Sequence, residues 1–230
     1  MSTFKYTAEA RLGEGIYTIP EASNILNLPK DIIRRWIKNY WELRFIENYS
    51  DENLKYTWGE SRNKAFNFFT LVEIIAVFSL RKIGISFNKI KIAHNQMIKL
   101  LNTPYPFATS KLMSDGGMIF WDYDESIFID LDRTLQLSLK EIIEPFCKKL
   151  DFCQSTNLAE RYWPLGKNHT IVVDPHHCFG QPTIFGTNIS THSILKIYSS
   201  GESQECIKTI YDLRTNQIED ALSYEDRYAA

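Results

Sequence analysis

Apolar residues near the start of the chain recur at the spacing of a short helix. Ala22, Ile25 and Leu26 fall on one helical face. Thr18 precedes this run and Glu21 follows Thr18 by three residues, a spacing typical of a capping box at a helix start. The next residues, Asn-Leu-Pro, are typical of a turn. The pattern therefore predicts a helix, a tight turn and a second helix directly after it.

The second helix, expected from about residue 30 to residue 40, divides into an apolar side and a basic side. The side that would be buried carries Ile33, Trp36, Ile37 and Tyr40. Two helices joined by a tight turn commonly present the other side to the major groove of DNA. The alternative is that an arginine of this helix forms a structural ion pair, for example with Glu42. The outward residues, which we take as candidate DNA contacts, are Lys30, Arg34, Arg35, Lys38 and Asn39.

Residues 45–69 are more polar and aromatic, and we interpret them as a two-stranded wing with a loop tip near residues 48–53. Three cations of this segment, Lys55, Arg62 and Lys64, would reach phosphates beside the groove. The alternative is that they are solvated loop charges.

Two further helices are predicted next. Thr70 and Glu73 have the spacing of a capping box before a strongly apolar run, which Gly84 is expected to end. Ser86 is expected to cap the following helix, which runs to about residue 101. This last helix is our candidate for a dimer seam, and packing within the monomer is the alternative.

The period changes to that of short strands over residues 110–133, where acidic pairs lie at the expected strand ends. We interpret these carboxylates as turn residues, because no nucleophile or phosphate-binding loop accompanies them. A further capping box over residues 138–141 predicts a helix to about residue 150. Residues 151–160 are polar and are interpreted as a linker or a short helix.

The remainder of the chain predicts a small unit of short strands followed by three helices. Residues 171–173 form one apolar strand, and glycines and a proline punctuate the strand–turn–strand that follows. Ser190 and Ser203 are expected to cap the first two helices, and Thr215 or Asn216 the third. The last helix is acidic, which makes it an improbable DNA reader.

These patterns predict a mainly α protein with small β elements. We divide it into a winged helix-turn-helix DNA-binding region over residues 1–107 and a connecting region of β-hairpin and helix over residues 108–160. A three-helix, helix-turn-helix-like domain preceded by short strands follows over residues 161–230.

Charge is distributed unevenly between the two halves of the chain. Residues 1–102 hold 15 Lys and Arg and 10 Asp and Glu, a net charge of +5. Residues 103–230 hold 11 and 18, a net charge of −7. A basic front half suits a phosphate backbone, which would repel an acidic rear half. Chance variation in surface charge is the alternative.

The sequence gives no sign of a membrane or of export. No apolar run approaches the roughly 18 residues that span a bilayer, and the first residues lack the pattern of a secretory signal. We therefore expect a cytoplasmic protein. Its four cysteines, Cys147, Cys153, Cys178 and Cys206, are then expected to be free thiols.

The densest group of metal-capable side chains is Asp174, His176, His177 and Cys178, with His169 nearby. These residues are nearly adjacent, and neighbours in an extended chain point to opposite faces. No HExxH or CxxC spacing is present. We therefore expect no metal, no cofactor and no enzymatic activity.

The front half resembles the winged helix-turn-helix of the MerR family. The resemblance implies DNA binding by this domain. One small domain makes a weak contact with a half-site, so we expect a dimer and a near-palindromic operator. The residues that carry the resemblance are Tyr17-Thr18-Ile19, Ala22, Leu26, Leu28, Ile33-Arg34-Arg35-Trp36 and the apolar helix from Phe69.

The tail, residues 174–224, resembles a small domain of unknown function found in VapB-type antitoxins. With both modules in one chain, the whole resembles a longer VapB-like architecture, which implies a PIN-like ribonuclease toxin as partner. The matching residues are Asp174-Pro175, Gly180-Gln181-Pro182, Ile184, Gly186-Thr187, Ile189, Gly201-Glu202-Ser203 and Ala221-Leu222-Ser223-Tyr224.

The tail departs from that family where cations are usual. The family's Gly-Thr-Arg-Ile-Pro is here Gly-Thr-Asn-Ile-Ser, and the arginine that often precedes the glycine is Phe185. We therefore assign the tail to protein contacts rather than to nucleic acid. The residues assigned to toxin binding are Phe185, Ile189, Leu195, Tyr198, Tyr211 and Tyr224.

The sequence thus predicts an antitoxin of a type II toxin–antitoxin system that neutralises a PIN-like ribonuclease and represses its own operon. A chain that ends after Leu150 is expected to keep DNA binding and to lose neutralisation. The alternative is a MerR-like, ligand-responsive transcriptional regulator. Sensing cysteines of such a regulator would usually lie near the dimer helix, and here none precedes Cys147.

Overall fold

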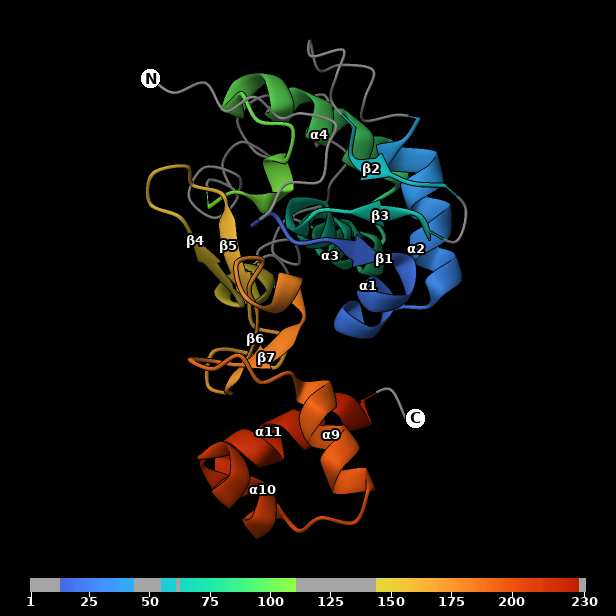
Figure 1. Ribbon diagram of the computed structural model, residues 1–230. Helices are drawn as coiled ribbons and strands as arrows, with labels where there is room; N and C mark the ends of the chain where they lie inside the picture. Colours follow the sequence, from blue (N-terminus) through green and yellow to red (C-terminus); the bar gives the residue numbers. More distant parts are fainter. Residues whose placement is uncertain (1–12, 44–54, 61–62, 111–143, 228–230) are drawn as a thin grey trace.

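The computed structural model describes residues 13–43, 55–60, 63–110 and 144–227 of the 230-residue chain. A helical front half and a helical tail are joined through a four-stranded sheet (Figure 1). The structure confirms the predicted mainly α fold with small β elements. Arg62, the expected loop tip at 48–53, the expected strands at 111–133 and the capping box at 138–141 lie outside the described residues.

The front half begins with the predicted helix, turn and helix. A short strand, β1 (Tyr17–Thr18), leads into α1 (Ile19–Leu26). The capping box is formed as expected, because the Glu21 carboxylate accepts a 2.8 Å hydrogen bond from the Thr18 backbone N–H. Asn27 ends α1 in the left-handed conformation, with φ of 52°.

The second helix has two parts. It begins as α2 (Lys30–Trp36), which follows Pro29 directly, and continues as one turn of π-helix, η1 (Ile37–Trp41). Its buried side is the predicted one, since Ile33 and Trp36 are both buried. The helix therefore keeps its basic side toward solvent.

Strand β1 and the two strands of the wing form a three-stranded antiparallel sheet in the order β1-β3-β2. The strands β2 (Thr57–Trp58) and β3 (Ala65–Phe66) form a hairpin, as expected for the wing. The loop that joins these strands spans residues 59–64, which is later in the chain than the tip expected from the sequence.

The helices α3 (Phe68–Lys82) and α4 (Phe87–Leu101) follow, and a 3-10 turn, η4 (Pro106–Ala108), lies after them. Ser86 caps α4 as predicted. The predicted cap of α3 is wrong, because the helix starts one turn earlier. Asn67, not Thr70, is its N-cap, and its side-chain oxygen accepts a 3.0 Å hydrogen bond from the Thr70 backbone N–H.

The strands β4 (Leu150–Phe152), β5 (Ala159–Tyr162), β6 (Ile171–Val173) and β7 (Pro182–Ile184) form an antiparallel sheet in chain order. The interpretation of residues 151–160 as a linker or a helix is therefore wrong. These residues form most of a hairpin, and pairing with the rest of the sheet stabilises the polar strands. That pairing is not visible in their local sequence.

The tail helices are α9 (Thr191–Ser199), α10 (Gln204–Tyr211) and α11 (Thr215–Asp226). Ser190 and Ser203 cap the first two as predicted. The third cap is corrected, because Arg214 occupies the N-cap position. Its backbone N–H donates a 2.8 Å hydrogen bond to Gln217 Oε1.

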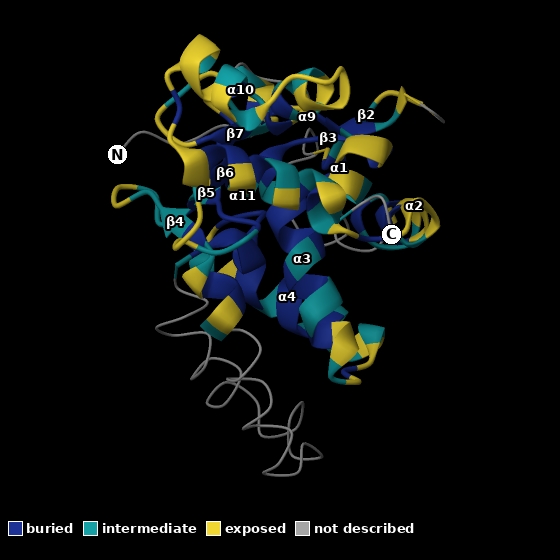
Figure 2. Ribbon diagram, turned by 90° about the horizontal axis from the view of Figure 1, so that it is seen from below, coloured by how far each residue is buried: buried dark blue, intermediate teal, exposed yellow. Residues whose placement is uncertain are grey.

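Two buried apolar clusters meet at the four-stranded sheet, and β6 contributes Val173 to the front cluster and Ile171 to the tail cluster. Figure 2 shows β6 as buried and α10 as a mixture of exposed and half-buried residues with one buried position. The front cluster extends beyond the front half and takes in Ala159 and Tyr162 from β5 and Val173 from β6. The sheet therefore crosses the boundary expected at residue 161, and the division into domains stays a prediction. The tail cluster consists of Ile171, Ile184, Ile194, Ile207, Leu213, Ile218, Ala221 and Tyr224.

Candidate functional site

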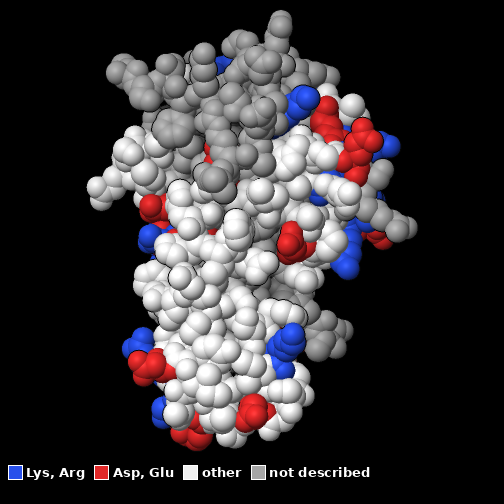
Figure 3. Space-filling model, in the orientation of Figure 1, with Lys and Arg blue, Asp and Glu red and all other residues white. Residues whose placement is uncertain are grey.

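The exposed side of α2 and η1 carries the cations expected from the sequence. Lys30, Arg34, Arg35 and Lys38 are all exposed, and Asn39 is half-buried. Figure 3 shows blue side chains along the edge of the molecule where α2 lies, with red ones among them. The structure thus places these side chains together on one face.

Arg34 forms an ion pair on this face with a neighbour on its own helix. Its Nη1 atom lies 2.7 Å from Asp31 Oδ1, and 58% of the Arg34 side chain and 92% of the Asp31 side chain are exposed. Exposed pairs of this kind contribute about 0–1 kcal/mol. A phosphate could therefore replace Asp31 as the partner of Arg34 at little cost.

The wing is fastened to the end of the second helix by Glu42. Lys64 forms an ion pair with the Glu42 carboxylate, and Thr57 Oγ1 donates a 2.8 Å hydrogen bond to the same oxygen. Glu42 therefore pairs with the wing rather than with the helix arginines. Of the predicted wing contacts, Lys64 is mostly buried by this pairing and Lys55 is exposed.

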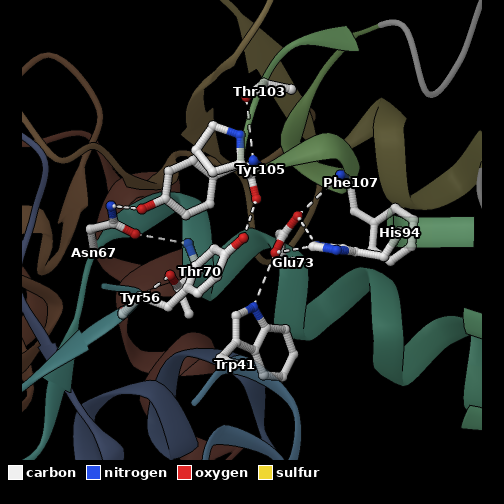
Figure 4. Close-up of polar contacts among 10 residues, drawn as sticks. Trp41, Tyr56, Asn67, Thr70, Glu73, His94, Thr103, Tyr105 and Phe107 are labelled. Atoms are coloured by element: carbon white, nitrogen blue, oxygen red, sulfur yellow. Dashed lines mark hydrogen bonds and ion pairs between the residues drawn. The ribbon is translucent and has the colours of Figure 1, made fainter. Parts of the chain in front are cut away.

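A buried carboxyl group, Glu73 of α3, joins the second helix to the rest of the front core (Figure 4). Trp41 Nε1 donates a 3.0 Å hydrogen bond to Glu73 Oε2, and the Phe107 backbone N–H donates a 3.2 Å bond to Oε1. His94 Nε2 of α4 lies 3.1 Å from Oε1. The sequence reading of Glu73 as a helix cap is wrong, because its partners come from three other elements.

A second buried group extends this network toward the wing (Figure 4). Asn67 Nδ2 donates a 2.8 Å hydrogen bond to Tyr105 Oη, and Tyr56 Oη donates a 2.8 Å bond to the Pro104 carbonyl oxygen. Tyr56 directly precedes β2. The network therefore holds the second helix, α4 and the wing in a fixed relation.

Of the residues assigned to toxin binding, Phe185 and Tyr198 are the most exposed, at 50% and 44%. The Phe185 ring lies 5.0 Å from the ring of Trp163, which limits its motion. Ile189, Leu195 and Tyr211 are half-buried. Tyr224 is only 1% exposed and packs in the tail cluster, so we leave it out of any proposed contact surface.

Two exposed apolar residues of the tail were not identified from the sequence. Ile210 is 60% exposed on α10, and Phe179 is 73% exposed in the 3-10 turn η5 (Cys178–Gly180). Cys178 and Phe179 have φ of 46° and 57°, a region that costs a residue with a side chain roughly 1–2 kcal/mol. The backbone of this turn keeps the Phe179 side chain exposed. Hydrophobic periodicity in the sequence cannot predict such a turn.

The metal-capable group of the tail is dispersed into separate pairings. Asp174 Oδ2 accepts a 2.9 Å hydrogen bond from Arg161 Nε and lies 3.2 Å from His177 Nδ1. His169 lies elsewhere, 2.7 Å from Asp220. Within the described ranges, no three His, Cys, Asp or Glu side chains lie close enough together to hold a metal ion.

Asp220 fixes the turn that precedes β6. Its carboxylate accepts hydrogen bonds of 2.7 Å from the Thr170 backbone N–H and 2.9 Å from the Thr170 hydroxyl, besides the contact with His169. Burial by itself would raise the pKa of Asp220, but these partners outweigh it and lower that pKa. Asp220, an acidic residue of α11, therefore stabilises this turn of the tail.

All four cysteines are free, as expected. Burial raises the pKa of Cys147 to about 12. Hydrogen bonds from Ser155 and Thr156 lower the pKa of Cys153 to about 7. Across the described part of the chain, no helix has the length and apolar character needed to cross a membrane.

Comparisons with known proteins bear on the tail and on the whole chain. The family described as "Protein of unknown function (DUF433)" matches residues 171–224, which agrees with the predicted tail resemblance. The chain is 22% identical over 231 residues to "Putative antitoxin VapB45" of Mycobacterium tuberculosis, covering 93% of this chain and 95% of that protein. A stretch of 58 residues, 25% of this chain and 24% of the relative, is 36% identical to "Uncharacterized protein Rv2308" of the same organism.

A solved structure shares the fold. The X-ray crystal structure of Rv2018 from Mycobacterium tuberculosis superposes with a TM-score of 0.69 at 20% sequence identity. The match covers 90% of this chain and 96% of that one. The front half and the tail therefore occur together in a known arrangement, while the assignment of the front half to the MerR family stays a prediction.

Proposed function

We propose that this protein is an antitoxin of a type II toxin–antitoxin system. It binds and neutralises a PIN-like ribonuclease through its tail, and it represses its own operon through α2. The observation that carries the proposal is the similarity to the named antitoxin over 93% of the chain. The separation of an exposed basic helix from an exposed apolar tail supports the division of labour.

For DNA binding, α2 would enter the major groove with the wing beside it. Arg34 and Arg35 provide fork-shaped donors for phosphate or guanine, and Lys38 provides a point charge. The wing is held against the end of the second helix by the Glu42 pairings, so both would meet DNA as one surface. One such unit makes a small contact, and we therefore propose a homodimer on two half-sites.

The proposed dimer seam lies on α4, although much of that helix packs within the monomer. Ile90, Ala93 and Met97 are buried in the front cluster. Leu100, at 46% exposure, leaves an apolar position for a second copy. The intramolecular packing fixes the orientation of α4 and hence that of the seam.

For neutralisation, the exposed rings of Phe185 and Tyr198 provide the anchors. Aromatic residues dominate the energetics of protein interfaces when they enter a partner's pocket. The acidic character of the rear half favours encounter with a ribonuclease, whose RNA-binding surface must be basic.

The test is co-expression with the small protein encoded beside this one, together with binding to the promoter region of the pair. The wild-type chain should restore growth that the neighbour arrests, and it should retard the promoter fragment. The Phe185→Asp/Tyr198→Asp variant should lose rescue and keep DNA binding. The Arg34→Ala/Arg35→Ala variant should keep rescue and bind the promoter about tenfold or more weakly, at about 1–3 kcal/mol per lost contact.

The matched control is Lys82→Ala/Lys208→Ala, which removes two exposed cations from helices outside the proposed DNA-binding surface and dimer seam. It should bind the promoter nearly as tightly as the wild type. If the neighbouring protein does not arrest growth, or if the wild-type chain fails to restore it, the antitoxin proposal is wrong.

A further inference from the structure

A groove of about 210 Å³ lies between the front half and the tail. Ile16, Glu21 and Asn24 line it from the region of β1 and α1. Phe179 and Glu225 line it from the tail. Figure 1 shows α1 on the side of the front half that faces the tail. The first helix of the helix-turn-helix and the last helix of the tail therefore both border this groove.

Two of the largest exposed apolar residues lie on its rim. Phe179 is 73% exposed and Ile16 is 43% exposed. The turn beneath Phe179 has three successive residues with positive φ, from Cys178 to Gly180. Strained turns that hold an aromatic ring out of the core are concentrated at binding sites. An exposed aromatic side chain beside a pocket is the arrangement that commonly anchors a protein interface.

The charge of the groove is of one sign. The Glu21 and Glu225 side chains line it, and no Lys or Arg of the described residues does so. His192 is the one lining residue, among those described, whose side chain can become positively charged. A partner that enters this groove should therefore carry an apolar side chain with cations beside it.

We propose that this groove is a docking site for a basic, apolar segment of the partner toxin. The inference rests on the proposed antitoxin function and adds to it a second contact surface. A ribonuclease that grips RNA phosphates has cations near its cleft, which match these carboxylates. A second copy of this chain fits less well, because a two-fold contact would bring two copies of the same acidic groove, each with Glu21 and Glu225, against each other.

The docked segment would touch α1 and the tail at once. Toxin binding would then bias the position of the helix-turn-helix relative to the tail. Any such bias is reciprocal, because a coupling free energy acts equally on both ligands. The groove thus joins neutralisation and repression within a single chain.

The first test uses Phe179→Asn in the full chain. Asparagine adopts the left-handed conformation readily, so the turn should keep its shape while the ring is lost. Toxin affinity, measured by titration calorimetry, should fall about tenfold or more. The control is Ile210→Asn, which removes another exposed apolar residue of the tail, 60% exposed and outside the groove, and should leave the affinity within about twofold.

The second test introduces a charge of either sign at one exposed, uncharged position of the groove. Asn24→Lys should weaken toxin binding, and Asn24→Glu should preserve or tighten it, with the difference shrinking at high salt. If the wild-type chain binds no toxin, the proposed function itself fails. If the wild type binds but Phe179→Asn and both Asn24 variants bind equally well, the groove is not the docking site. A change from dimer to monomer in Phe179→Asn with unchanged toxin affinity would assign the groove to a second copy and overturn the proposal.

Discussion

Cys147 and Cys153 are close in the chain but lie in opposite surroundings. Cys147 is buried against the front core, and burial raises its pKa to about 12. Cys153 lies in the turn after β4, where hydroxyl groups of Ser155 and Thr156 hydrogen-bond to its thiolate. The thiolate is the reactive form, so the two thiols should differ widely in reactivity.

We expect iodoacetamide to alkylate Cys153 before Cys147 in the native protein. A pKa of about 7 means that the fraction of thiolate, and with it the alkylation rate, should rise as the pH increases through neutrality. Peptide mapping by mass spectrometry at a series of pH values measures both rates. Ser155→Ala removes the hydroxyl that hydrogen-bonds most strongly to the thiolate, and it should move the rise to higher pH. Equal labelling of both cysteines at neutral pH would contradict the assignment.

At the scale of single elements, Glu73 determines how the second helix is held. Its carboxyl oxygens accept from Trp41 of η1 and from Phe107 of η4, and they contact His94 of α4. All of these groups are buried, so removal of the acceptor leaves several polar groups without a partner away from water. The position of the basic helix thus depends on one side chain of α3.

Glu73→Ala should lower the free energy of unfolding by about 3–5 kcal/mol, the range for breaking a buried pair. Glu73→Gln keeps the shape and one carbonyl acceptor, and it should be less harmful. Urea unfolding followed by tryptophan fluorescence measures both. A loss below about 0.5 kcal/mol for Glu73→Ala, typical of a surface site, would show that the network does not stabilise the front half.

Elements whose signals are local were predictable, and those whose partners are distant were not. Ser86, Ser190 and Ser203 each precede an apolar period and do cap helices, because cap and period lie within one turn. Glu73 has the spacing of a cap residue, but Trp41 and Phe107 give it another role. Residues 151–160 were misassigned because cross-strand pairing stabilises them.

The same distinction applies to the candidate sites. The exposed cations of α2 follow from helical period alone, and the structure places them as expected. The groove and its rim could not be predicted. They depend on the left-handed turn at Phe179 and on the approach of the tail to α1, neither of which has a periodic signature.

At the scale of the whole molecule, the front core does not end where the front half of the sequence ends. Ala159 and Tyr162 of β5 and Val173 of β6 belong to the front cluster. A chain that stops after Leu150 would therefore lack part of its own core. The expectation that such a truncation leaves DNA binding intact stays a prediction, and the shared core argues against it.

Truncation after Leu150 should lower the melting temperature of the front half well below that of the full chain, because it exposes apolar surface worth about 25 cal/mol per Å². Differential scanning calorimetry measures the change. The full chain should melt in one main transition, since the sheet joins both clusters. A truncated chain that melts at the same temperature and binds the promoter normally would show that β5 and β6 contribute little.

The close contact between Tyr17 and Gly180 limits how this architecture can be recombined. A Cβ atom on residue 180 would fall 2.0 Å from Tyr17 Oη, so the tail accepts this tyrosine only because it has a glycine there. Tyr17 lies just before α1 and Gly180 lies in the tail, and both line the groove where the front half meets the tail. A hybrid that joins this tail to another front half, or this front half to another tail, should assemble only when both positions are compatible. Exchange of toxin specificity between such chains would thus require inheritance of the pair together.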